Sequence, residues 1–131
     1  MTSSHLPPRV LVVDNDEAVC SATAEMLESL GYQADCETDS RSALKVFAEN
    51  PDKFALAIIE PVLPDIMGLN LAIRLKAIRP DLRVLFYAGY ADESLSSRIE
   101  ADGHGQVALK PFRLSELAAA VKERLSSGSV G

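Results

Sequence analysis

The stretch LAIIEPVLPD, residues 56–65, joins a short apolar run to an acid and two prolines. Residues 55–59, ALAII, have the continuous apolar pattern of a strand that is covered on both faces. Glu60 directly follows this run, and Pro61 cannot donate to a strand ladder because it lacks a backbone N–H. The stretch therefore predicts a buried strand that ends at an acid.

Similar strands and amphipathic helices alternate along the rest of the chain. Helical spacing of apolar residues and helix-ending signals predict the helices, with Ser40 as the N-cap of the second and residues 114, 117, 118, 121 and 125 on one face of the last. The expected strands are 9–13, 32–37, 55–59, 83–87 and 106–109, and the expected helices are 16–30, 40–50, 69–78, 92–101 and 114–125. This alternation predicts an α/β fold with a doubly wound parallel sheet and helices on both faces.

Length and composition indicate one soluble domain. The chain has 131 residues, a formal net charge of −6 and two cysteines. A negative charge disfavours binding to nucleic acid or anionic membranes, and no apolar run is long enough to span a bilayer. We expect a flexible leader at 1–8, a domain at 9–125, a tail or linker start at 126–131, and a cytoplasmic location with reduced thiols.

Candidate site residues follow four of the predicted strands: acids after two of them, a small residue after one and Lys-Pro after one. In an open parallel sheet, ligands bind outside the carboxyl ends of the strands. Singly, each residue has a structural explanation, as a helix cap, a solvated acid, or a surface lysine beside a turn proline. Together they predict a site at one edge of the sheet. The residues are Asp14, Asn15 and Asp16, then Glu60, then Ala88, then Lys110 and Pro111.

Four motifs at these strand ends resemble the response-regulator receiver domain of two-component signalling over residues 9–125. They are VLVVDND (10–16), IIEPVLPDIMGL (58–69), VLFYAGY (84–90) and ALKPF (108–112). The resemblance implies a CheY-like, flavodoxin-like fold with five strands in the order 2-1-3-4-5 and five helices on two faces. It also implies that a histidine kinase phosphorylates an aspartate after strand three, with Mg²⁺ held by two acids after strand one.

The residues at the matching positions depart from the family pattern. Asp14 matches the first acid, but Asn15 stands where a metal-ligating aspartate is usual. Glu60 occupies the phosphoacceptor position, and Ala88 replaces a hydroxyl residue. By the same resemblance, Lys110 is retained before Pro111, whose peptide bond is cis in the family. Val107 takes the place of an aromatic switch residue, and the backbone carbonyl of Val62 is a further metal ligand.

Each departure acts against phosphoryl transfer. Glu60 moves its carboxylate outward by about 1.3–1.5 Å, whereas in-line attack needs closely aligned atoms. Asn15 removes a charge from the Mg²⁺ ligands, and Ala88 removes a donor worth about 1.5–3 kcal/mol. We therefore expect a pseudo-receiver that is not an enzyme, requires no cofactor and binds Mg²⁺ weakly. An ion pair between Glu60 and Lys110 would fix one signalling state; loss of an unused site by drift is the competing explanation.

Two other functions remain open. One is a working Mg²⁺-dependent phosphoacceptor that uses Glu60 or a nearby acid, Asp65 or Asp16. The other is a flavodoxin-like cofactor module, which is disfavoured because the loop DNDEA is acidic and no Gly-rich phosphate loop is present. Under the leading interpretation the partner is a histidine kinase, an output domain or a downstream regulator. The family also implies a homodimer through the fourth helix, fifth strand and fifth helix.

Overall fold

The computed structural model describes residues 7–88, 106–109 and 113–127. Its five strands form one parallel sheet in the order β2-β1-β3-β4-β5, as expected for a doubly wound fold. The strands are β1 (Arg9–Val13), β2 (Gln33–Glu37), β3 (Leu56–Ile59), β4 (Arg83–Ala88) and β5 (Gln106–Leu109).

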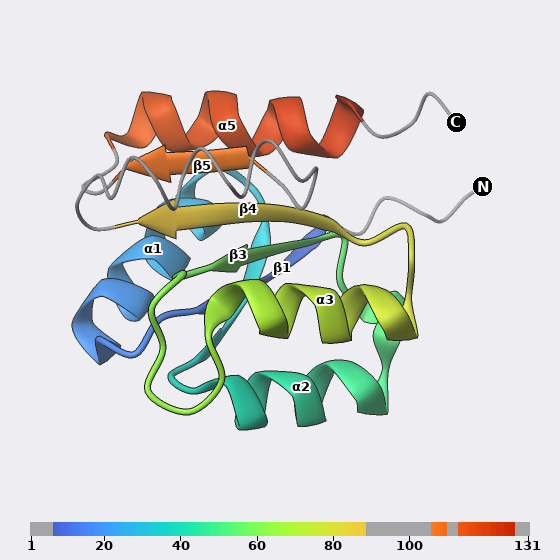
Figure 1. Cartoon of the computed structure of the whole chain (residues 1–131). Coiled ribbons are helices and arrows are strands. Elements are labelled where there is room, and N and C mark those ends of the chain that lie inside the picture. The colour runs from blue at the N-terminus through green and yellow to red at the C-terminus, as the bar shows by residue number, and fades with distance from the viewer. Residues whose placement is uncertain (1–6, 89–105, 110–112, 128–131) are drawn as a thin grey trace.

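Helices cover both faces of this sheet (Figure 1). The helices are α1 (Glu17–Ser29), α2 (Ser40–Glu49), a short 3-10 helix η1 (Pro51–Lys53), α3 (Gly68–Ile78) and α5 (Leu114–Ser127). Buried residues of α2 and α3 share one apolar cluster, and those of α1 and α5 share the other. The helix expected at 92–101 lies outside the described residues.

Strands β1 and β3 contribute to both clusters, which confirms that they are covered on two faces. Leu11 and Ile59 belong to the α2–α3 side, and Val12 and Ile58 to the α1–α5 side. All four side chains are buried. Burial on both faces explains why residues 10–13 of β1 and all residues of β3 are apolar instead of alternating.

One expectation about the helices was wrong. The N-cap of α2 is Asp39, not Ser40: the Asp39 carboxylate accepts a 2.7 Å hydrogen bond from the Ser42 N–H. Ser40 is instead buried, and its hydroxyl donates to the carbonyl of Ile66 at 2.5 Å. Leu114 is 47% exposed, so the buried stripe of α5 starts one turn later, at Leu117. That helix also continues to residue 127, into the expected tail.

Across the described part of the chain, no helix has both the length and the apolar character needed to cross a membrane.

Candidate functional site

The pairing of β1 with β3 places Asp14 and Glu60 at adjacent positions on the carboxyl edge of the sheet. Val13 lies opposite Ile59 in the parallel register, and the Glu60 N–H donates to the Val13 carbonyl at 2.9 Å. The Asp14 N–H in turn donates to the carbonyl of Glu37, at the end of β2, at 3.1 Å. Three neighbouring strands thus end in acids at one edge.

The acids of this edge differ in burial. Asp14 is 1% exposed, Glu60 is half-buried, and Asn15 is exposed. Glu37 is half-buried as well: burial, followed by the nearby carboxylates of Asp39 and Asp35, raises the pKa of Glu37 above its usual value. The carboxylates of Asp35 and Asp39, which contribute to this shift after burial, lie close to the end of β2 and make that end locally negative. The edge therefore suits a cation better than an anion.

Asp16 is the N-cap of α1. Its carboxylate accepts hydrogen bonds from the backbone N–H groups of Ala18 at 3.0 Å and Val19 at 3.2 Å. Asp14 supports this turn by accepting from the Asp16 N–H at 2.9 Å. The structural explanation of Asp16 as a helix cap is confirmed.

The loop from Glu60 to Gly68 turns back tightly on β3. The Gly68 N–H donates to the carbonyl of Pro61 at 2.8 Å. A Cβ atom at position 68 would overlap the carbonyl oxygen of Glu60 and approach Ile59 and Pro61 closely. Only glycine allows this approach. The backbone of Glu60 is therefore held from both sides, by Val13 and by Gly68.

The same loop is tied to the start of α2 by Asp65. Its carboxylate accepts from the N–H groups of Ser40 at 3.1 Å and Arg41 at 3.0 Å, across 25 and 24 residues of sequence. Desolvation opposes ionisation of Asp65, but hydrogen bonds from four backbone N–H groups outweigh it and lower its pKa to about 2. Asp65 thus acts as an anion at the N-terminus of α2.

Other predicted site residues are only partly placed. Ala88 ends β4 opposite Leu109, and Val107 lies in β5 opposite Phe86. The side chain of Val62 is 59% exposed. Lys110 and Pro111 fall outside the described residues, so the ion pair with Glu60 and the cis bond stay predictions.

Within the described ranges, no group of three or more His, Cys, Asp or Glu side chains is arranged to hold a metal ion. Asp14 and Glu60 supply two carboxylates, and Asn15 supplies a neutral oxygen in place of a third. Mg²⁺ is commonly held by one or two carboxylates with water. The donors present therefore fit a weak site for Mg²⁺.

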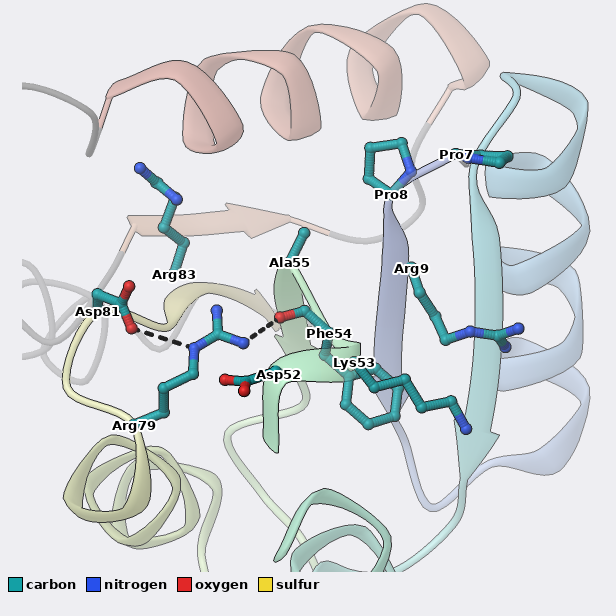
Figure 2. Close-up of a pocket in the computed structure, with 10 residues that line it drawn as sticks. All are labelled: Pro7, Pro8, Arg9, Asp52, Lys53, Phe54, Ala55, Arg79, Asp81 and Arg83. Carbon is teal, nitrogen blue, oxygen red and sulfur yellow. Dashed lines mark hydrogen bonds and ion pairs between the residues drawn. The ribbon is translucent and has the colours of Figure 1, made fainter. Parts of the chain in front are cut away.

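A second depression lies at the opposite, amino edge of the sheet (Figure 2). Its basic side chains are largely engaged. Arg79 donates to Asp81 at 3.1 Å and to the carbonyls of Pro51 and Phe54 at 2.7 and 2.5 Å. Arg9 pairs with Asp35 at 2.6 Å, outside the group drawn in the figure. The hydrogen bonds of Arg79 hold the end of α3 against η1 and the residues that lead into β3. The side chains of this depression therefore have a structural role.

A doubly wound sheet with acids at the ends of β1 and β3 places the chain among flavodoxin-like signalling modules. The chain belongs to the response regulator receiver domain family, whose model matches residues 10–122. It is therefore a receiver domain of two-component signalling. This match confirms the family that the four sequence motifs predicted.

Curated relatives differ greatly in length. The response regulator receiver protein CpdR of Brucella abortus is 30% identical over 117 residues, which cover 89% of this chain and 96% of that protein. The sensor kinase CckA of the same organism is 30% identical over 116 residues, covering 88% of this chain. This chain spans only 12% of that kinase.

Solved structures agree with the fold. The CheY-like receiver domain protein of Methanospirillum hungatei superposes with a TM-score of 0.82 at 29% identity, covering 93% of this chain and 96% of that one.

Proposed function

We propose that this receiver domain acts through protein contacts and is not switched by ordinary aspartyl phosphorylation. The observation that carries the proposal is the fixed backbone of Glu60 beside Asp14. Its N–H is bonded to Val13, and its carbonyl is packed against Gly68. The backbone has no room to retreat and absorb the extra methylene of glutamate. Its carboxylate therefore ends about 1.3–1.5 Å beyond an aspartate's reach.

This displacement weakens the acceptor. Near-attack geometry requires reacting atoms about 3–3.5 Å apart, and a 1 Å misplacement costs on the order of 100-fold in rate. The charge removed at Asn15 lowers Mg²⁺ affinity, and the lost hydroxyl at Ala88 removes a further phosphoryl contact. When bound, Mg²⁺ would neutralise charge between a phosphodonor and the acids. The residues Asp14 and Glu60 would hold it.

The permanent charge of Glu60 supports a fixed signalling state. In this proposal its carboxylate pairs with Lys110 and presents a constant negative group where the family carries a transient one. Decay of an unused site predicts the same sequence changes but no effect of Glu60 on partner binding. The two explanations therefore differ in one measurable quantity, the partner affinity of a Glu60→Gln variant.

The proposed partner is a protein of a two-component pathway: a histidine kinase, an output domain or a downstream regulator. The matches to a sensor kinase and to a receiver protein of similar length support this class. By the family resemblance we expect the partner surface on β4, the helix predicted at 92–101, β5 and α5, and a homodimer surface on the last three of these elements. The net charge of −6 supports a cytoplasmic domain that binds neither nucleic acid nor membrane.

A phosphodonor assay tests the proposal. The wild-type chain and a restored variant, Asn15→Asp with Glu60→Asp and Ala88→Thr, are incubated with Mg²⁺ and acetyl phosphate and analysed by intact mass. We expect a phosphoryl adduct on the restored variant and none on the wild type. The double variant Asn15→Asp with Ala88→Thr, which keeps Glu60, is the control. An adduct of equal yield at Glu60 in the wild type would overturn the proposal.

A further inference from the structure

The only two cysteines of the chain lie against each other, one in α1 and one in β2. The Cys36 thiol donates to the backbone carbonyl of Cys20, with a sulfur–oxygen distance of 3.0 Å. Since both are free thiols and the Cys36 sulfur contacts the backbone of Cys20, they form a pair of neighbouring thiols at the interface between helix and sheet.

Cys20 lies behind the acidic edge. It is fully buried, and its thiol faces the carbonyls of Val12 and Glu37 at 3.5 and 3.7 Å. The carbonyl of Glu37 is the one that accepts from the Asp14 N–H. Any change at this sulfur thus acts directly on the peptide groups that position Asp14.

The two thiols are unequal. Cys36 is half-buried, whereas Cys20 has no exposed surface. Exposure to the oxidant decides which of the two cysteines reacts first. Cys36 is therefore the thiol that meets an oxidant, and Cys20 is the one positioned to resolve it.

We infer that Cys20 and Cys36 form an oxidation site, at which a hydroperoxide closes an intramolecular disulfide between α1 and β2. The Cys36 thiolate attacks the peroxide, the O–O bond breaks, and water or an alcohol leaves, giving a sulfenic acid. The Cys20 sulfur then attacks the Cys36 sulfur, the S–O bond breaks, and water leaves. In total, two thiols lose two electrons and two protons, and the peroxide is reduced.

The disulfide replaces the thiol contacts of Cys20 with Val12 and Glu37. The Glu37 carbonyl also accepts the hydrogen bond from the Asp14 N–H. Oxidation therefore alters the position of Asp14 at the acidic edge without any chemical change at Glu60. This gives the domain an input that is independent of phosphorylation, and the inference stands whether or not Glu60 accepts a phosphoryl group.

Hydrogen peroxide treatment of the folded full chain tests the site. After alkylation of remaining thiols, intact mass and peptide mapping should show a monomer lighter by two hydrogen atoms, with a Cys20–Cys36 cross-link that dithiothreitol reverses. Amide NMR resonances of Asp14 and Glu37 should shift on oxidation and return on reduction.

Two variants serve as controls, each checked for native circular dichroism. In Cys20→Ser, Cys36 should stop at a sulfenic acid that dimedone traps. In Cys36→Ser, Cys20 should stay reduced under the same treatment. If one variant does not fold, the other still reports. The inference is overturned by sulfinic acid at Cys36 without a cross-link, by an intermolecular disulfide, or by oxidation that occurs only when urea unfolds the chain.

Discussion

The backbone N–H of Glu60 lies 2.9 Å from the carbonyl oxygen of Val13 and donates to it. This one hydrogen bond continues the β1–β3 ladder one residue beyond β3 and sets Glu60 beside Asp14. In our proposal Glu60 stands at the acceptor position of the receiver family with a longer side chain. Because the backbone of Glu60 is fixed, the longer side chain should weaken phosphoryl transfer, and this loss can be measured.

Gly68→Ala should destabilise the domain, because a new Cβ would overlap the carbonyl of Glu60. Overpacking of this kind typically costs about 1–3 kcal/mol. Urea unfolding measures the loss. The control is Asn70→Ala in the same helix, where the side chain is exposed and a change within about 0.5 kcal/mol is expected. Equal effects of the two substitutions would show that the loop does not press on Gly68.

Asp16→Ala should lower stability without changing Mg²⁺ binding, because Asp16 caps α1. Loss of an N-cap costs about 0.5–2 kcal/mol. Thermal unfolding measures the loss, and calorimetric titration measures Mg²⁺ affinity. Asp39→Ala, which removes the cap of α2, is the matched control. A large fall in Mg²⁺ affinity with Asp16→Ala would instead make Asp16 a metal ligand.

Asp65 should make the folding stability of the domain depend on pH. Its pKa is about 2 in the folded domain, below the ordinary 3.8. A lowered pKa stabilises the folded state above pH 3.8, and this contribution is lost as pH falls through about 2. Asp65→Asn should therefore lower the melting temperature at neutral pH and flatten its fall between pH 4 and 2. Glu25 is an exposed acid of α1, and Glu25→Gln is the control. In this control the melting temperature should still fall steeply between pH 4 and 2. If the melting temperature of Asp65→Asn fell as steeply as that of the wild type, the lowered pKa assigned to Asp65 would be contradicted.

Much of the fold follows from local patterns in the sequence. The apolar runs at 9–13 and 55–59 predict strands buried on both faces, and their alternation with amphipathic helices predicts the parallel sheet. The rule that sites lie at strand ends also brings Asp14 and Glu60 together correctly. These successes share a cause: each depends on residues close in sequence or on the geometry common to all parallel sheets.

The contacts that sequence reasoning missed are distant in sequence. Asp65 caps α2 across 25 residues, and Cys36 meets Cys20 across 16. No local spacing signals either contact. The wrong N-cap of α2 has the same origin, since Asp39 and Ser40 are both good caps by residue type. The tertiary bond from the Ser40 hydroxyl to Ile66 removes Ser40 from that role.

The central claim is that the site of Glu60 does not switch. Amide NMR titration of the wild-type chain with Mg²⁺, and then with beryllium fluoride, tests it most directly, with the restored variant titrated alongside. We predict no saturable shifts with beryllium fluoride at Asp14, Glu60 or the ends of β4 and β5, and clear saturable shifts in the restored variant. Saturable shifts in the wild type that spread from Glu60 along β4 and β5 would show a working switch and contradict the account.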